Sequence, residues 1–117
     1  MKNKPELKID EYGDKYWYLN GLYHREDGPA IEYADGGKEW YLKGKVHREN
    51  GPACEYASGT KAWYLNGKLH RTDGPAIERS DGTKIWFLNG KIVKEEDVID
   101  INPKITEREY IKFVINQ

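Results

Sequence analysis

The chain has 117 residues, with 19 basic and 20 acidic side chains, 13% aromatic residues and a single cysteine, Cys54. This charge balance argues against strong electrostatic capture of nucleic acid or of an anionic membrane, which needs a basic excess or a basic stripe. The lone cysteine excludes an internal disulfide framework and fits a reducing compartment. The polar N-terminus lacks a signal-peptide core, and no apolar run approaches the roughly 18 residues of a membrane span. We therefore expect a cytoplasmic protein.

The first predicted elements are strands at 7–11 and 15–19, and their pattern returns along the chain. A segment that begins with Trp and ends with Gly-Pro-Ala recurs at a constant step of 23 residues, over 17–30, 40–53 and 63–76. A fourth copy opens at Trp86 and then breaks off. A fixed period of this length marks a repeat array, which we assign to residues 1–92.

Each repeat predicts one β-hairpin, because a Gly-containing turn stands between two extended runs rich in aromatic residues. After the first hairpin, the later ones are predicted at 30–34 with 38–42, 53–57 with 61–65, and 76–80 with 84–88. Between hairpins, Asn-Gly or Lys-Gly begins a second turn. Strand starts are expected at Pro29, Pro52 and Pro75, because proline has no N–H for a central ladder.

The predicted register depends on the turn at Asp35-Gly36. A two-residue turn makes Ile31 face Trp40, and alternation puts Leu42 on the same face. One face would then carry an apolar stripe of Trp, Leu and Ile. The opposite face would carry Ala30, Glu32, Glu39 and Tyr41.

The last segment, 93–117, departs from the repeat and is predicted to cap the array. Thr106 and Glu109 form a capping box, which predicts a short amphipathic helix at 107–115. A helix here would cover the open end that a repeat array leaves. The fold class expected is therefore mainly β: an elongated single sheet of about four β-hairpins with a short C-terminal helix.

The histidines His24, His47 and His70 recur once per repeat. Consecutive copies are two strands apart, about 10 Å, so they cannot share one metal ion. We expect each to hydrogen-bond loop backbone and to pack on a neighbouring aromatic ring. Cys54 stands where other repeats have isoleucine, which predicts apolar filling. No zinc pattern, phosphate loop or nucleophile motif is present, so no catalytic, cofactor or metal site is predicted.

Arginine and tyrosine also recur once per repeat, and they are the residue types that most often carry binding energy. Each arginine lies two residues before Asp or Asn, which favours local pairing within the loop. The alternative is that the arginines bind carboxylates or phosphates of a partner. The predicted partner-binding residues are Arg25, Arg48, Arg71, Tyr18, Tyr41 and Tyr64.

The repeat resembles the MORN-type repeat, which also has about 23 residues with an aromatic strand, Asn-Gly, a His-containing loop and Asp-Gly. The resemblance covers residues 12–92, and Trp40, Lys43-Gly44, His47 and Asp35-Gly36 carry it in one repeat. The departure is the segment His-Arg-x-x-Gly-Pro-Ala, where the family more commonly has His-Gly-x-Gly. This variant is similar to repeats in phage, giant-virus and bacterial antitoxin-like proteins.

The resemblance implies an elongated one-sheet repeat used for protein contacts. The function predicted is a non-enzymatic protein-binding module, namely an inhibitor of a host or cognate protein such as a phage counter-defence protein or an antitoxin. One alternative is a binder of a membrane surface or lipid headgroup, and another is a small-ligand or nucleotide binder. A homodimer through a sheet edge is a further partner hypothesis.

Overall fold

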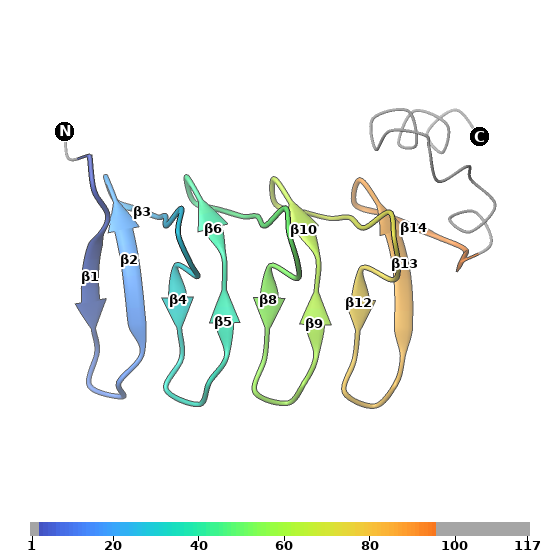
Figure 1. Ribbon diagram of the computed structural model, residues 1–117, viewed down its shortest axis with the longest axis horizontal. Coiled ribbons are helices and arrows are strands. Elements are labelled where there is room, and N and C mark those ends of the chain that lie inside the picture. Colours follow the sequence, from blue (N-terminus) through green and yellow to red (C-terminus); the bar gives the residue numbers. More distant parts are fainter. Residues whose placement is uncertain (1–2, 96–117) are drawn as a thin grey trace.

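The computed structural model describes residues 3–95, which form a row of antiparallel hairpins standing side by side (Figure 1). The predicted mainly β fold, an open sheet of hairpins, is confirmed. The helix predicted at 107–115 and nearly all of the cap at 93–117 lie outside the described residues.

The strands predicted at 15–19 and 84–88 have the predicted bounds, whereas the strands of the middle repeats are shorter than predicted because the ladder is interrupted there. The observed strands are named in chain order. They are β1 (Glu6–Ile9), β2 (Lys15–Leu19), β3 (Leu22–Tyr23), β4 (Ile31–Glu32), β5 (Lys38–Glu39), β6 (Tyr41–Leu42), β7 (Lys45–Val46), β8 (Cys54–Glu55), β9 (Lys61–Ala62), β10 (Tyr64–Leu65), β11 (Lys68–Leu69), β12 (Ile77–Glu78), β13 (Lys84–Leu88) and β14 (Lys91–Val93).

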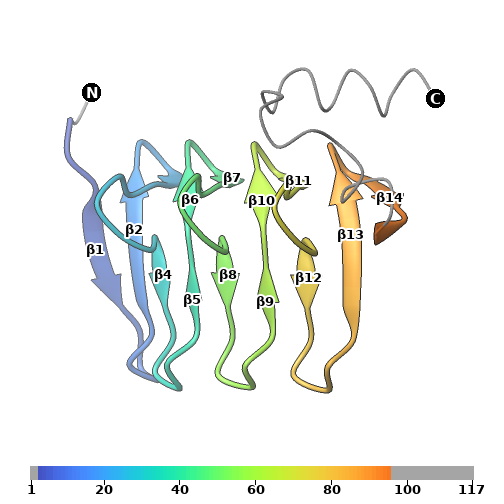
Figure 2. The ribbon, with the colours of Figure 1, turned by 45° about the vertical axis from the view of Figure 1, so that its right-hand side comes forward.

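The main sheet has the order β1-β2-β4-β5-β8-β9-β12-β13-β14, and β3 pairs with β2. This order follows the chain, so each repeat adds two strands beside the previous one. The pairs β6-β7 and β10-β11 form separate small hairpins, which stand at the same end of successive repeats (Figure 2). The molecule is therefore a single open layer, and both faces of the sheet lack a second layer within the described residues.

The turn of each hairpin is one residue longer than predicted. The N–H of Tyr33 donates to the carbonyl of Gly37 over 2.8 Å, and the N–H of Gly36 donates to the carbonyl of Tyr33 over 3.0 Å. These bonds enclose a three-residue loop in which Gly36 has a φ of +98°, the geometry of a type I turn with a glycine bulge. As a result Ile31 pairs with Glu39, and the predicted pairing of Ile31 with Trp40 is wrong.

This shift of one residue exchanges the faces of one strand in each hairpin, because directly paired residues share a face. The N–H of Trp17 donates to the carbonyl of Ala30 over 2.8 Å, so Trp lies beside Ala and not beside Ile. Ile31 instead shares a face with Glu39 and Tyr41. The predicted Trp-Leu-Ile face is therefore corrected to one face with Trp, Leu, Ala30 and Glu32, and another with Ile or Cys, Tyr and Glu39.

The second turn of each repeat begins as predicted with Asn-Gly or Lys-Gly. In the first, Asn20 has a φ of 51° and Gly21 a φ of 84°, which is the two-residue type I′ hairpin turn. Lys43 adopts the same conformation with a φ of 49°, although lysine has no side-chain group that favours it. No helix within residues 3–95 is long and apolar enough to cross a membrane.

Candidate functional site: hollows between the repeating loops

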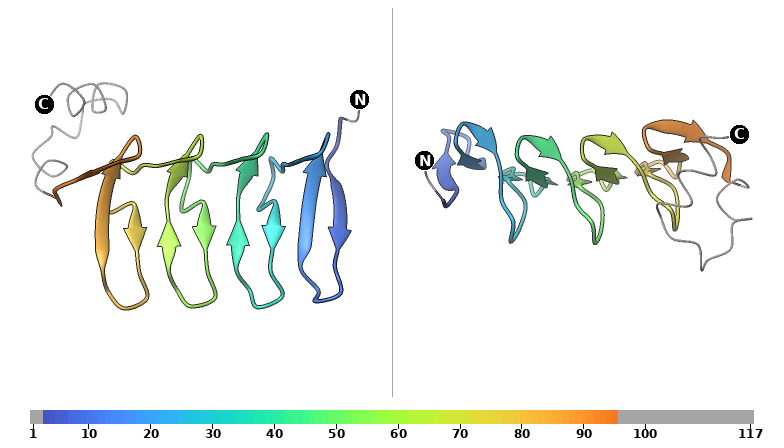
Figure 3. Two further views of the ribbon diagram at one scale, coloured as in Figure 1. Left: turned by 180° about the vertical axis from the view of Figure 1, so that it is seen from behind. Right: turned by 90° about the horizontal axis from the view of Figure 1, so that it is seen from above.

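The segment His-Arg-x-x-Gly-Pro-Ala forms a loop after each second turn. Seen from above, these loops project in a row to one side of the sheet (Figure 3). At the start of the first loop, the N–H of His24 donates to the carbonyl of Trp17 over 3.0 Å. At the end of this loop, Ala30 lies beside Trp17. Because Trp lies beneath the loop, the row of loops covers the Trp face of the sheet.

Each histidine connects its own repeat to the next. The Nδ1 atom of His24 accepts a hydrogen bond from the N–H of Lys43 over 2.9 Å, and His24 is only 5% exposed. His47 and His70 make the same bond to Asn66 and Asn89, also over 2.9 Å. Since Nδ1 accepts, the ring proton lies on Nε2 and the ring is neutral in this arrangement. The expected bond to loop backbone is confirmed, and its partner is the second turn of the following repeat.

Each arginine lies flat on the tryptophan of its own repeat. The guanidinium carbon of Arg48 lies 3.8 Å from the centre of the Trp40 ring, and Arg48 also donates to the carbonyl of Pro52 over 3.0 Å. A cation over an aromatic ring and a planar donor fork are the two properties that distinguish arginine from lysine. The equivalent distances to the ring centre are 3.9 Å for Arg25 on Trp17 and 3.8 Å for Arg71 on Trp63.

Carboxylates complete the environment of the arginines. The Nε atom of Arg71 donates to Asp73 over 2.8 Å, and Nη1 lies 3.7 Å from Glu78. Local pairing of Arg with Asp, one of the two roles considered from the sequence, thus occurs in the first and third repeats. A Cβ at Gly74 would lie 2.7 Å from the Arg71 guanidinium, so a larger residue there would have to displace the arginine from Trp63. The recurring segment is therefore a structural unit in which every residue type has a defined contact.

Along the described part of the chain, three similar hollows open between these loops. The first has Trp17 and Leu19 in its wall, the second Trp40 and Leu42, and the third Trp63 and Leu65. Their volumes are about 490, 560 and 490 Å³ respectively. Each is bounded by its own loop and by the segment one repeat earlier.

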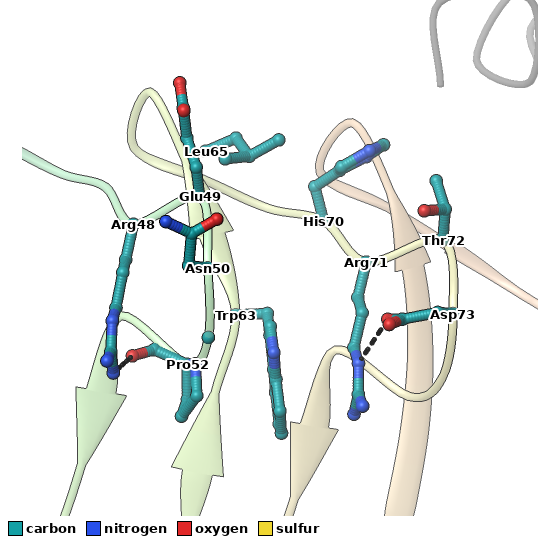
Figure 4. Close-up of a pocket in the computed structure, with 11 residues that line it drawn as sticks. Arg48, Glu49, Asn50, Pro52, Trp63, Leu65, His70, Arg71, Thr72 and Asp73 are labelled. Atoms are coloured by element: carbon teal, nitrogen blue, oxygen red, sulfur yellow. Dashed lines mark hydrogen bonds and ion pairs between the residues drawn. The ribbon is translucent and has the colours of Figure 1, made fainter. Parts of the chain in front are cut away.

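The third hollow shows the arrangement of these walls (Figure 4). Trp63 stands between Pro52, from the preceding loop, and Arg71, which covers its other side. Glu49 and Asn50 belong to the preceding loop, whereas Thr72 and Asp73 belong to its own loop. Each hollow thus combines an aromatic and aliphatic wall with carboxylates, which suits a ligand that has both an apolar part and a cationic group.

The opposite face of the sheet carries the tyrosines. Tyr23 packs against Tyr18 and Tyr41, with ring centres 4.8 and 5.2 Å apart. Further along, the hydroxyls of Tyr33 and Tyr41 donate to Glu39 over 3.1 and 2.9 Å. Burial, followed by the contact with Glu39, raises the pKa of both phenols. These tyrosines remain protonated hydrogen-bond donors over the physiological pH range.

Cys54 lies on this tyrosine face and is 4% exposed. Burial raises the pKa of its thiol to about 11, so the reactive thiolate is scarce at neutral pH. The burial agrees with the filling role expected from Ile31 and Ile77 at the equivalent positions. Within residues 3–95, no group of three or more His, Cys, Asp or Glu side chains is arranged to hold a metal ion.

The predicted partner-binding residues fall into two separate groups. Arg25, Arg48 and Arg71 line the hollows on the Trp face, with side chains 22, 29 and 19% exposed. Tyr18, Tyr41 and Tyr64 lie on the other face, because neighbouring residues of a strand point to opposite sides. A flat partner can therefore contact one group or the other.

Sequence reasoning missed the hollows because they form between two repeats. Their lining includes Leu42, Glu26 and Glu49, none of which was selected as a candidate. One sequence signal for the lining of these hollows was the acidic residue, Glu26 or Glu49, that follows His-Arg in the first two repeats. No protein-family model, curated protein or solved structure matches this chain.

Proposed function

We propose that this chain is a non-enzymatic protein-binding module whose binding surface is the row of loop hollows on the Trp face. The observation that supports it is the repetition of one hollow of mixed character three times along an open sheet. A row of equivalent hollows suits an elongated partner with repeated side chains. The resemblance to MORN-type repeats of phage and antitoxin-like proteins supports the narrower proposal that binding inhibits the partner.

The environments of the repeated carboxylates also favour binding over catalysis. Glu32, Glu55 and Glu78 lie 3.5, 3.7 and 3.7 Å from the arginine of their own repeat. General acid and base groups need environments that push their pKa values apart. The three carboxylates named above have an arginine as partner in each repeat, so their environments do not differ in this way.

The test is affinity capture from a lysate of the native host with three immobilised proteins: the wild type, Glu49→Arg and Glu11→Arg. Glu49 is exposed and lines both the second and the third hollow, whereas Glu11 lies in the turn at the opposite end of the first hairpin. We expect a protein that the wild type and Glu11→Arg retain and that Glu49→Arg loses, with equal melting temperatures. Capture that is equal for all three proteins would place the binding surface elsewhere, and capture of none would contradict the proposed function.

A further inference from the structure

The three hollows are aligned along one direction and present the same surfaces in the same order. Each has one Trp and one Leu in its wall, and each receives the loop of the preceding repeat or the N-terminal segment. Each repeat contributes two strands to the sheet, so consecutive hollows are about 10 Å apart. A ligand that fills all three must present equivalent side chains at this interval.

The charge of the hollows selects the kind of side chain. Glu26 and Glu49 both line the second hollow, and their side chains are 83 and 77% exposed. The Nε2 atom of His24 lies 3.6 Å from Glu26, and the Nε2 atom of His47 lies 3.6 Å from Glu49. Those rings are neutral in this arrangement, and no lysine or arginine nitrogen of residues 3–95 lies within 4.0 Å of either carboxylate, so the two carboxylates have no cationic partner among the described residues.

The arginines of the hollows are already engaged and do not supply that cation. Arg48 is stacked on Trp40, donates to Pro52 and lies 3.7 Å from Glu55. Each hollow also includes at least one carboxylate from Glu26, Glu49 or Asp73, and the first hollow has Lys4 in its wall as well. A lysine or arginine of the ligand fits such a site, because its aliphatic stem can lie along Trp and Leu while its charge reaches the carboxylates.

The interval between hollows selects the backbone of the ligand. A polyproline II helix has three residues per turn and a rise of about 3.1 Å, so every third side chain returns to one side after about 9.3 Å. In a β-strand the third residue points to the opposite side. An α-helix needs seven residues for about 10.5 Å and is about 10–12 Å wide, which fits separate hollows less well.

We propose that the three hollows form one track for a basic peptide segment in the polyproline II conformation, with lysine or arginine at every third residue. This inference rests on the proposed protein-binding function and specifies the partner. The segment contacts the described chain at the Trp face and leaves the tyrosine face free.

The experiment uses the full chain and synthetic peptides, with binding followed by isothermal titration calorimetry and tryptophan fluorescence. The first peptide has four Lys-Pro-Pro units, and the second has the same composition with its lysines in one block. A third has lysine at every seventh position of a helix-forming sequence. We expect the first to bind about tenfold more tightly than the other two, and its affinity to fall as salt is added. Equal affinity of the first two, or tighter binding of the helical peptide, would overturn the proposal.

A pair of matched variants locates the site. The double variant that carries both Glu26→Gln and Glu49→Gln should bind the Lys-Pro-Pro peptide about tenfold more weakly. The control is the double variant that carries both Glu11→Gln and Glu95→Gln. It changes the net charge by the same amount as the first double variant, at exposed positions outside the hollows, and should leave the affinity for the peptide unchanged. Equal weakening by both pairs would mean non-specific attraction and would overturn the track.

The two proposals fail in distinguishable ways. If no basic peptide binds while capture from lysate still depends on Glu49, the track is wrong and the protein-binding function stands. If no basic peptide binds and the wild type captures no protein, both proposals are wrong.

Discussion

The Nδ1 atom of His47 accepts a hydrogen bond from the backbone N–H of Asn66, 2.9 Å away and 19 residues further along the chain. The same bond joins His24 to Lys43 and His70 to Asn89. The acceptor lies at the start of one loop, and the donor lies in the second turn of the following repeat. Short strands of two residues offer few ladder bonds, so these bonds help to hold neighbouring repeats in register.

We expect His47→Ala to destabilise the protein by about 0.5–1.5 kcal/mol, because the exposed N–H of Asn66 exchanges its histidine acceptor for water. The measurement is the free energy of unfolding from urea denaturation followed by circular dichroism. Lys45→Ala, at an exposed position of β7, is the control and should change the free energy of unfolding by less than about 0.5 kcal/mol. Losses of the same size in both variants would show that the histidine bond contributes nothing specific.

Arg71→Lys should destabilise the protein by about 1–2 kcal/mol although the charge is retained. Lysine cannot stack flat on Trp63 at 3.8 Å while donating to both Asp73 and the carbonyl of Pro75. The same change at Arg79, an exposed arginine in the last hairpin turn, should have no measurable effect. Thermal melting followed by tryptophan fluorescence compares the two variants, and equal melting temperatures would contradict this role of the stack.

Lys43→Asn should stabilise the protein by about 1 kcal/mol, because the left-handed conformation strains lysine more than asparagine. Lys43 has a φ of 49°, and Asn66 holds the equivalent position with a φ of 50°. The backbone N–H that binds His24 is retained in the variant. The reverse change, Asn66→Lys, should cost a similar amount in urea denaturation, and opposite signs for the two changes are the outcome that supports the argument.

The free energy of unfolding should fall at alkaline pH because of the tyrosine face. The hydrogen bond with Tyr18, and then burial, raises the pKa of Tyr23 to about 12. Unfolded tyrosine ionises near pH 10. A raised pKa in the folded state gives stability that is fully present below about pH 10 and is lost as the pH rises through about 12.

Urea denaturation at a series of pH values, with phenolate absorbance at each, measures this loss. Glu39→Gln is the informative variant, since the carboxylate contributes to the raised pKa of Tyr33 and Tyr41. It should shift the ionisation of these phenols to lower pH. Stability that is flat between neutral pH and pH 12 would contradict the prediction.

The sequence by itself determined the architecture, because the signals for it are local. Asn20-Gly21 and its counterparts require positive φ at two successive residues, which is the conformation of a tight hairpin turn. The constant step from Trp17 to Trp40 repeats this unit, so an open row of hairpins follows from the chain alone. Spacing also excluded a shared metal ion, since equivalent histidines are two strands apart.

Only the tertiary structure decided which side chains share a face. The bond from Tyr33 to Gly37 encloses three residues instead of two, and this single extra residue moves Ile31 away from Trp40. Both turns are compatible with the same Asp-Gly sequence. The difference between them changes the residue opposite Trp40 in its hairpin from Ile31 to Ala30.

The roles of His and Arg were likewise decided by contacts that sequence proximity does not reveal. His24 binds the turn at Lys43 in the next repeat, and Arg48 lies over Trp40, which stands between β5 and β6. The second and third hollows form where one loop stands beside the tryptophan of the following repeat, and the N-terminal segment takes the place of that loop in the first. The recurring motif therefore predicted that the histidines and arginines have a role, but not which role. The stacking of repeats determined that they hold the fold together. The same stacking leaves Glu26 and Glu49 exposed beside the Trp face.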